Sequence, residues 1–299
     1  MQAVILGSAA GGGVPQWNCR CPVCQLAWAG DPRVKAGTQS SLAVSPDGER
    51  WLVLNASPDI RHQISQTGDL HPRMGLRHSP IDAVLLTSAE VDHVAGLLTM
   101  RERQPFAVFA TPQILDTLAL NPIFDVLAPQ LVTRHAVDFE QSFEPVGGLL
   151  ATIFAVPGKV PLWRENQEGI SDDSSGTTVG VILESSAKRI AYIPGCAWID
   201  DDLLRRIAGV DALLFDGTVF RDDELIQAGV SEKTGRRMGH VPMSGQDGSL
   251  VRLRDVPASR RVFVHINNTN PVLVQDSPER RLVEQQGWIV AHDGLRIFP

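Results

Sequence analysis

Short apolar runs alternate along the chain with amphipathic stretches. Runs rich in β-branched and other apolar side chains predict strands, and apolar positions at helical spacing predict helices. The expected strands cover residues 3–6, 41–44, 51–54, 83–87, 106–110, 150–156, 178–183, 189–193, 212–216, 261–265 and 288–290. The expected helices cover residues 59–66, 92–102, 113–119, 200–207, 249–255 and 278–286.

The order of these elements is similar in the two halves of the chain. Strand pairs at hairpin spacing are followed by strands that alternate with helices, which predicts two mixed sheets covered by helices, a layered fold of the α/β class. No low-complexity tract, charge block or internal repeat marks a linker. We therefore predict a single domain over residues 1–299.

The bulk properties narrow the possible partners. A formal net charge of −7 argues against nucleic acid as a ligand. No apolar run approaches the length of a membrane span, so we expect no membrane association. The first residues are uncharged and are expected to form a strand instead of a signal peptide, which favours a cytoplasmic protein.

Polar side chains gather where predicted strands end. The apolar run 81–87 leads directly into a polar cluster, and two later apolar runs each end on one polar residue. The residues are Ser88, Glu90, Asp92, His93, Asp216 and His265. Carboxylates and imidazoles at neighbouring strand ends predict a mixed oxygen and nitrogen metal site. The alternative for each residue taken singly is a structural polar group with its own hydrogen bonds.

Three of the four cysteines lie close together, at Cys19, Cys21 and Cys24. Thiolates bind zinc in tetrahedral sites, and three on one short loop can fill three corners, so this spacing predicts a structural zinc. A redox pair would need the two-cysteine motif at a helix start, and disulfides are rare in a reducing compartment. The fourth ligand must come from elsewhere. Cys196 is expected to be a small buried residue.

Two long segments without periodicity, residues 157–177 and 217–245, are expected to be loops. Long loops on a rigid scaffold often carry function, and plain surface insertions are the alternative. His240 is either a loop anchor or a substrate contact. Arg236, Arg237 and Lys159 are candidates for binding carboxylates of a substrate.

Together these segments resemble the metallo-β-lactamase superfamily and, within it, a family of pyrroloquinoline quinone (PQQ) biosynthesis proteins. The resemblance runs from the opening strand and cysteine cluster through residues 55–59, 88–93, 215–218, 238–244 and 265–271. The cysteine spacing combined with Ser-Ala-Glu-Val-Asp-His is its most specific part. The resemblance implies a four-layer αββα sandwich with metal at one edge between the two sheets.

The resemblance also implies roles for individual residues. Asp92 and His93 fall on the last two residues of the superfamily's metal signature, Asp216 on the carboxylate that bridges two metals, and His265 on the final histidine. Ser88, Glu90 and Gly158 replace the three histidines of the first metal position. The departures predict one metal held by Asp92, His93, Asp216 and His265. Glu90 is expected to be a further ligand or a proton acceptor, and Ser88 a substrate or water contact.

Two histidines with carboxylates and open positions are typical of non-heme iron oxygenases. The resemblance implies an Fe(II)-dependent hydroxylase of PQQ biosynthesis that acts on the tyrosine ring of a Glu-Tyr-derived intermediate. Zinc, manganese, magnesium or copper are expected to be able to replace the iron. The alternatives are a carrier that moves PQQ or its precursor towards the periplasm and, with less support, a zinc hydrolase.

For the cysteine zinc, the resemblance implies that the fourth ligand lies at Asn268, and a water or His240 are the alternatives. Because the cluster lies in a loop that needs an external support, it could also order a dimer interface. We expect a homodimer.

Overall fold

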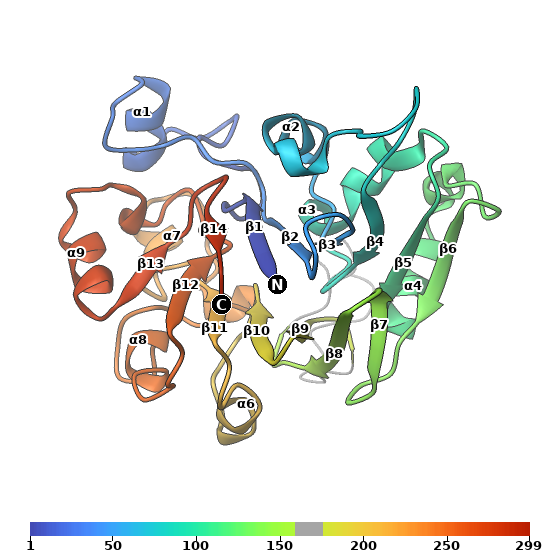
Figure 1. The fold of residues 1–299 in the computed structure, drawn as a ribbon. Coiled ribbons are helices and arrows are strands. Elements are labelled where there is room, and N and C mark those ends of the chain that lie inside the picture. The colour runs from blue at the N-terminus through green and yellow to red at the C-terminus, as the bar shows by residue number, and fades with distance from the viewer. Residues whose placement is uncertain (159–175) are drawn as a thin grey trace.

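Two seven-stranded mixed sheets stack face to face in the computed structural model, which describes residues 1–158 and 176–299 (Figure 1). The first sheet has the order β14-β1-β2-β3-β4-β5-β6. Its strands are β1 (Gln2–Gly7), β2 (Ser41–Ser45), β3 (Trp51–Leu54), β4 (Ile81–Leu85), β5 (Phe106–Ala110), β6 (Val132–Ala136) and β14 (Arg296–Ile297). Because β1 pairs with β14, the two termini lie side by side.

The second sheet has the order β13-β12-β11-β10-β9-β8-β7. Its strands are β7 (Ser142–Val146), β8 (Leu149–Ala155), β9 (Val179–Ser185), β10 (Lys188–Ile193), β11 (Ala212–Asp216), β12 (Arg260–Val264) and β13 (Trp288–Val290). Strands β10 to β13 run parallel, as do β3 to β6 in the first sheet. The carboxyl ends of β4, β11 and β12 therefore supply the loops along one edge of the sandwich.

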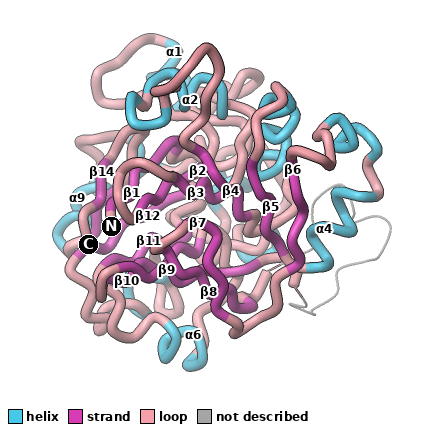
Figure 2. Tube along the Cα trace, turned by 45° about the vertical axis from the view of Figure 1, so that its right-hand side comes forward, coloured by secondary structure: helices cyan, strands magenta, loops and turns pink. Residues whose placement is uncertain are grey.

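Helices cover the outer faces of both sheets (Figures 1 and 2). The α-helices are α1 (Pro22–Trp28), α2 (Ile60–Gln66), α3 (Val91–Val94), α4 (Pro112–Ala119), α6 (Asp201–Arg206), α7 (Glu224–Gln227), α8 (Ser249–Arg252) and α9 (Pro278–Gln285). Short 3-10 helices are η1 (Gly68–Leu70), η2 (Ala95–Arg101), η3 (Pro122–Val126), η5 (Arg236–Met238) and η6 (Pro271–Leu273). The arrangement confirms the predicted αββα sandwich.

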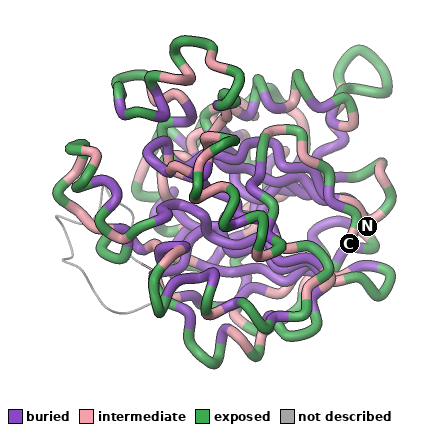
Figure 3. The backbone as a smooth tube through the Cα atoms, turned by 90° about the vertical axis from the view of Figure 1, so that its left-hand side faces the viewer, coloured by how far each residue is buried: buried purple, intermediate pink, exposed green. Residues whose placement is uncertain are grey.

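Three apolar cores separate the four layers, and Figure 3 shows the buried strands between exposed outer segments. The central core lies between the sheets and contains Leu54, Leu85 and Leu214, each fully buried. Alternate residues of the same strands face outward and pack under the helices, as Val84 and Phe215 do. Burial on both faces explains why these strands are continuous apolar runs in the sequence.

A helix is present where one was predicted over residues 92–102, but most of it is a 3-10 helix and not an α-helix. It begins as α3 and continues as the 3-10 helix η2. Gly96 lies at the junction, where an added Cβ would sit 2.1 Å from the Ser57 carbonyl oxygen. This close approach requires a glycine at position 96.

The sequence prediction missed β6, β7, β14, α1 and α7, the last of which lies in the predicted loop 217–245. Strands β6 and β7 close the far edges of the two sheets and are partly exposed, so they carry polar residues. Helix α1 begins inside the cysteine cluster, where the Cys21 sulfur accepts from the Cys24 N–H at 3.4 Å. A thiol cap is not among the usual helix-start signals. Within the described residues, no helix is long and apolar enough to span a membrane.

Candidate metal centre

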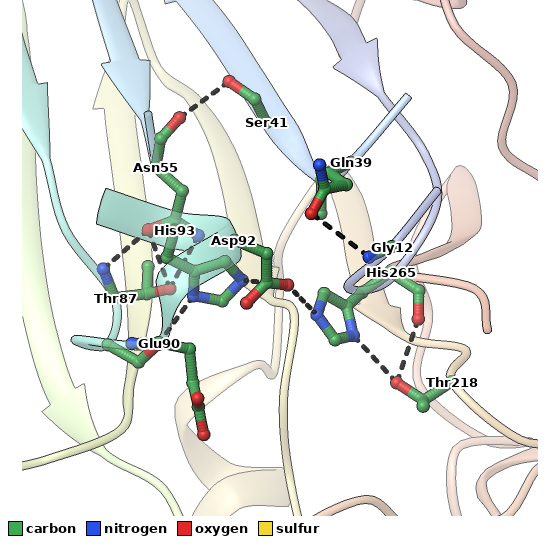
Figure 4. A network of polar contacts seen from close by, with 12 residues as sticks. Gly12, Gln39, Ser41, Asn55, Thr87, Glu90, Asp92, His93, Thr218 and His265 are labelled. Carbon is green, nitrogen blue, oxygen red and sulfur yellow. Dashed lines mark hydrogen bonds and ion pairs between the residues drawn. The ribbon is translucent and has the colours of Figure 1, made fainter. Parts of the chain in front are cut away.

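The loop after β4 is held by Asn55 at the end of the neighbouring strand β3. The Asn55 Oδ1 atom accepts from the Thr87 N–H at 2.8 Å, and its Nδ2 donates to Thr87 Oγ1 at 2.8 Å (Figure 4). Asn55 has a left-handed backbone with φ of 63°, which asparagine tolerates better than most residues. The fixed loop delivers Asp92 and His93 on α3 to the sheet edge.

Asp92, His93 and His265 form the first ligand cluster, with one donor atom from each lying within 4.8 Å of the others. The Asp92 Oδ2 atom is 3.2 Å from His265 Nε2 and 3.8 Å from His93 Nε2. His93 Nε2 is buried and makes no hydrogen bond within the described structure. A buried polar atom without a partner is costly, and a metal ion facing both imidazoles would satisfy it. The residues present therefore fit a metal.

Ser88 orients the His93 ring. Its Oγ lies 2.7 Å from His93 Nδ1 and also accepts from the Glu90 N–H at 3.2 Å. When Nδ1 carries the proton and donates it to this hydroxyl, Nε2 presents its lone pair to the cluster. Metal-binding histidines commonly have such a partner on the second nitrogen. The predicted contact of Ser88 with substrate or water stays a prediction, and the structure adds this orienting contact.

Burial and the neighbouring charges together set the pKa values of these groups. Burial lowers the pKa of His93 to about 4, and the nearby Asp92 charge opposes the shift only in part. Burial acting alone would raise the pKa of Asp92, but the charges of His93 and His265 and a hydrogen bond from His265 bring it below its ordinary value. For His265, the Asp92 contacts overcome burial and raise the pKa. A neutral imidazole beside an ionised carboxylate is the state that binds a metal.

Asp216, His240 and His265 form a second cluster that shares His265 with the first. Asp216 is fully buried at the end of β11. Its Oδ1 accepts from the Thr218 N–H at 3.0 Å and hydroxyl at 2.7 Å. Its Oδ2 accepts from the Cys196 N–H at 2.9 Å and lies 2.8 Å from His240 Nδ1. Asp216 thus anchors the loops around it and lies beside the first ligand cluster.

The Thr218 hydroxyl connects the two clusters. Its Oγ1 lies 2.8 Å from His265 Nδ1 and 3.0 Å from His240 Nδ1. A hydroxyl has one hydrogen to donate, so the imidazoles must supply protons for the remaining contacts. If His265 donates from Nδ1, its Nε2 is left facing Asp92, which is the tautomer needed for metal binding.

A cavity of about 720 Å³ opens onto this edge. Its lining includes the two histidines and Asp92 of the first cluster, together with Ser88, Glu90, His240, Asn267, Leu225, Met238 and Lys233. Figure 4 shows the Glu90 carboxylate pointing away from Asp92 and His265, and Glu90 belongs to neither ligand cluster found among the described residues. This placement suits a proton acceptor or substrate contact better than a ligand.

The predicted basic residues are placed differently from the expectation. Neither Arg236 nor Arg237 lines the described part of the cavity, and both are exposed on η5. Lys233 is the one lysine or arginine among the described lining residues. Lys159 lies outside the described residues, as does most of the predicted loop 157–177.

His240 is the main residue whose position the sequence did not predict. The structure places it at the edge site, 2.8 Å from Asp216. It does not belong to the cysteine cluster, for which it was an alternative fourth zinc ligand. Its setting in Met-Gly-His-Val-Pro gives no partner spacing. Thr218, by contrast, follows two residues after Asp216 on the same strand end, so its proximity could have been expected.

The cysteine cluster is a separate and mostly apolar site. The sulfurs of Cys19, Cys21 and Cys24 lie within 4.8 Å of one another, and the Asn268 amide nitrogen lies 3.1, 3.7 and 3.3 Å from them. The Asn268 side chain therefore lies against all three sulfurs, and its role as the fourth zinc ligand stays a prediction. Rotating the amide by 180° exchanges its nitrogen and oxygen, and the oxygen would then face a metal held by the sulfurs.

Burial raises the pKa of two of the thiols. It raises the pKa of Cys21 to about 12 and that of Cys196 well above the usual value. For Cys19, burial acts in the same direction, but hydrogen bonds from Cys21, Cys24 and Asn268 outweigh it and lower the pKa. Cys196 is completely buried, which confirms the prediction for that residue.

Comparisons with known proteins agree with this architecture. Residues 50–266 match the β-lactamase superfamily domain. The chain is 64% identical to coenzyme PQQ synthesis protein B of Methylobacterium sp. (strain 4-46) and 51% identical to that of Xanthomonas campestris pv. campestris (strain B100), over 99% of each chain. The crystal structure of Zn²⁺-bound PqqB from Methylobacterium extorquens superimposes with a TM-score of 0.96 at 61% identity, covering 100% of both chains.

A more distant solved structure, a diphosphatase from the PhnP family, has a TM-score of 0.69 at 21% identity, covers 100% of this chain and 97% of its own, and shows the fold alone. The full-length relatives settle the narrower grouping. The chain belongs to the coenzyme PQQ synthesis protein B family within the β-lactamase superfamily.

Proposed function

We propose that this protein is an Fe(II)-dependent hydroxylase of PQQ biosynthesis that adds oxygen to the tyrosine ring of a Glu-Tyr-derived precursor. The observation that carries the proposal is the convergence of His93, His265 and Asp92 at a cavity, with His93 Nε2 buried and lacking a hydrogen bond within the described structure. Two histidines and one carboxylate with open positions are typical of non-heme iron oxygenases. When bound, iron would supply the one-electron chemistry that oxygen activation needs.

The protein's own residues would arrange this site. Ser88 and Thr218 hold the His93 and His265 rings through their Nδ1 atoms, which directs both Nε2 atoms to the metal position. His240 has its Nδ1 occupied by Asp216 and Thr218, so its Nε2 is the nitrogen left for a substrate proton. Glu90 on the cavity wall is the second candidate to accept a proton.

The cavity fits a small polar aromatic substrate. Its apolar wall includes Val91, Leu225 and Met238, which could pack against a ring. Lys233 is also a lining residue and would pair with a carboxylate of the substrate. We also propose a homodimer acting on this small molecule, without nucleic acid or membrane as a partner.

The structure disfavours a two-metal hydrolase. The third missing histidine corresponds to Gly158, where an added Cβ would lie 2.6 Å from Thr178 Oγ1 and 2.7 Å from Thr178 Cβ. A histidine there would require Thr178 to move. Ser88, at another of the replaced positions, is already engaged with His93. The first metal position has therefore lost its three histidine ligands, and at Gly158 it has also lost the space for one of them.

The deciding experiment is oxygen-dependent mass gain on the Glu-Tyr-derived precursor with iron-loaded protein. We expect oxygen incorporation with Fe(II), none with zinc, and none from His93→Ala loaded under the same conditions. Oxygen uptake measured in parallel separates turnover from binding. If iron-loaded protein bound the precursor or PQQ tightly and added no oxygen, the carrier hypothesis would replace this one.

A further inference from the structure

One short segment, residues 265–270, runs from the edge site to the cysteine cluster. His265 at its start contributes to both ligand clusters of the edge site. Asn268 in its middle lies against the three thiols, 3.1 Å from the Cys19 sulfur and 3.3 Å from the Cys24 sulfur. Each site thus depends on the position of the same stretch of backbone.

His265 needs external support. Its backbone is left-handed with φ of 55°, a conformation that costs energy for a residue with a Cβ and persists only where the surroundings hold it. The Thr218 Oγ1 atom lies 2.9 Å from the His265 carbonyl oxygen and 2.8 Å from His265 Nδ1. The next residue, Ile266, donates its N–H to the Ser8 carbonyl and accepts from the Ala10 N–H, both at 2.9 Å.

The loop that supports Ile266 is also the loop that carries the thiols. Residues 8–10 follow β1, and the chain continues from them into the cysteine cluster. The two stretches of chain are therefore joined twice: by backbone hydrogen bonds at Ile266 and by the thiols at Asn268. If the contacts of Asn268 with the thiols were lost, the backbone hydrogen bonds of Ile266 would be the remaining link between the two stretches, and the left-handed conformation of His265 would be less well supported.

Further contacts link the same segment to Asp216. The Asn267 N–H donates to the Thr218 carbonyl at 3.0 Å, and the Asn270 side chain donates to the Gly217 carbonyl at 2.9 Å. Residues 217 and 218 directly follow Asp216. A shift of residues 267–270 would therefore reach a carboxylate and a histidine of the edge site together.

We propose that the cysteine cluster with its metal bound is a positioning element for the edge site: it holds residues 265–270 so that His265 Nε2 faces Asp92, and it thereby raises the affinity of the edge site for metal. The coupling is reciprocal, because two sites that share one positioned segment must favour each other equally. This inference goes beyond the hydroxylase proposal and does not depend on the reaction catalysed.

The test is the affinity of the edge site for Co(II), measured by visible absorption in protein whose thiol site holds zinc. Zinc retained after removal of edge-site metal is measured by elemental analysis. Asn268→Ala removes the side chain that meets the thiols, and Asn268→His restores a strong zinc ligand there. Asp47→Ala is the matched control, because Asp47 stabilises the β2–β3 turn by accepting from the Glu49 and Arg50 N–H groups.

We expect Asn268→Ala to weaken Co(II) binding at the edge site by roughly tenfold or more and to alter its absorption spectrum, as losses of ligand-orienting groups do. Asn268→His should return the affinity close to the parental level, because histidine supplies a zinc ligand at the same position. Asp47→Ala should leave it unchanged. Chelating the thiol-site zinc from the unmodified protein should produce the same loss as Asn268→Ala, and this comparison needs no variant to fold.

Three results would overturn the proposal. Co(II) affinity could stay at the parental level in Asn268→Ala, or in parent protein stripped of thiol-site zinc. Asp47→Ala could weaken the edge site as much as Asn268→Ala, which would indicate a general loss of stability. Each result is distinguishable from failure of the hydroxylase proposal, since no turnover is measured.

Discussion

The two candidate metal sites differ in how the chain builds them. The cysteine cluster takes three donors from residues 19–24 and packs them beside Ala9, Val14 and Val34, and Cys19 and Cys21 also line a second cavity of about 620 Å³. The edge site collects its donors from α3, the ends of β11 and β12 and a loop, and faces a cavity of about 720 Å³. A closed thiolate set suits a structural metal, while a set with open positions suits chemistry.

The two sites also differ in how many polar side chains contact their donor atoms. Asn268 is the one described side chain that meets all three thiols, so the cysteine cluster has few orienting partners. At the edge site, Ser88 and Thr218 each contact an imidazole nitrogen, and Asp216 accepts several hydrogen bonds. The three thiol donors are therefore brought together by local sequence, whereas the edge site is organised by hydrogen bonds between distant segments.

The largest effect should come from His265→Ala. His265 belongs to both edge-site clusters, so its loss should weaken edge-site metal binding beyond the roughly 10–100-fold expected for an orienting residue. Zinc at the cysteine cluster should remain. Metal titration with elemental analysis measures both sites. Parental affinity at the edge site would show that the metal is held elsewhere.

The next effect should come from Cys21→Ser, which removes one thiol ligand. We expect loss of the tightly held zinc and a fall in melting temperature of at least roughly 5 °C, given about 2–4 °C per kcal/mol for a domain of this size. Cys196→Ser is the cysteine control for zinc content, since Cys196 is buried at a distance from the cluster. If the variant kept its zinc and its melting temperature were unchanged, the cysteine cluster would have no structural role.

Ser88→Ala should have an intermediate effect confined to the edge site. The hydroxyl lies 2.7 Å from His93 Nδ1, and loss of such a partner typically lowers metal affinity by about 10-fold. Glu90→Ala is the matched control, because its carboxylate points away from the cluster and its loss should change affinity by no more than about twofold. Metal titration measures both variants. A larger loss of affinity in Glu90→Ala than in Ser88→Ala would show that Glu90 is a metal ligand.

The smallest effect on metal binding should come from Glu224→Gln, which instead changes how stability depends on pH and probes the segment between the sites. Glu224 accepts from the Thr269 hydroxyl at 2.6 Å, and burial raises its pKa from 4.5 to about 7. The protonated form is favoured in the folded state, so its stabilising contribution is full below pH 4.5 and is lost as pH rises through about 7. Neutral glutamine should remove this dependence, which is on the order of 3 kcal/mol.

Melting temperatures of parent and Glu224→Gln across this pH range measure the effect. The two curves should lie close together at the acidic end, and the parent should fall below the variant near neutral pH. Parallel curves would mean that Glu224 is ionised in the folded protein throughout the range.

The strand ends were predictable because their pattern is local. Apolar runs that stop at Thr87, Asp216 and His265 identify buried strands whose polar ends meet at one sheet edge. The cysteine spacing predicted its cluster for the same reason, since three donors on one short loop need no distant partner. Partly exposed β6 and β7 were missed because edge strands need not be apolar on either face.

The tertiary structure alone decided which polar residues meet. His240 has no partner in sequence, and only the return of its loop to β11 brings it 2.8 Å from Asp216. The same folding turns Glu90 away from the cluster and brings Lys233, in place of Arg236 and Arg237, to the cavity wall. Apolar periodicity records burial along one element, whereas side-chain contacts depend on how elements far apart in the chain pack together, so the sequence determined the scaffold and its edge, and the packing determined the site.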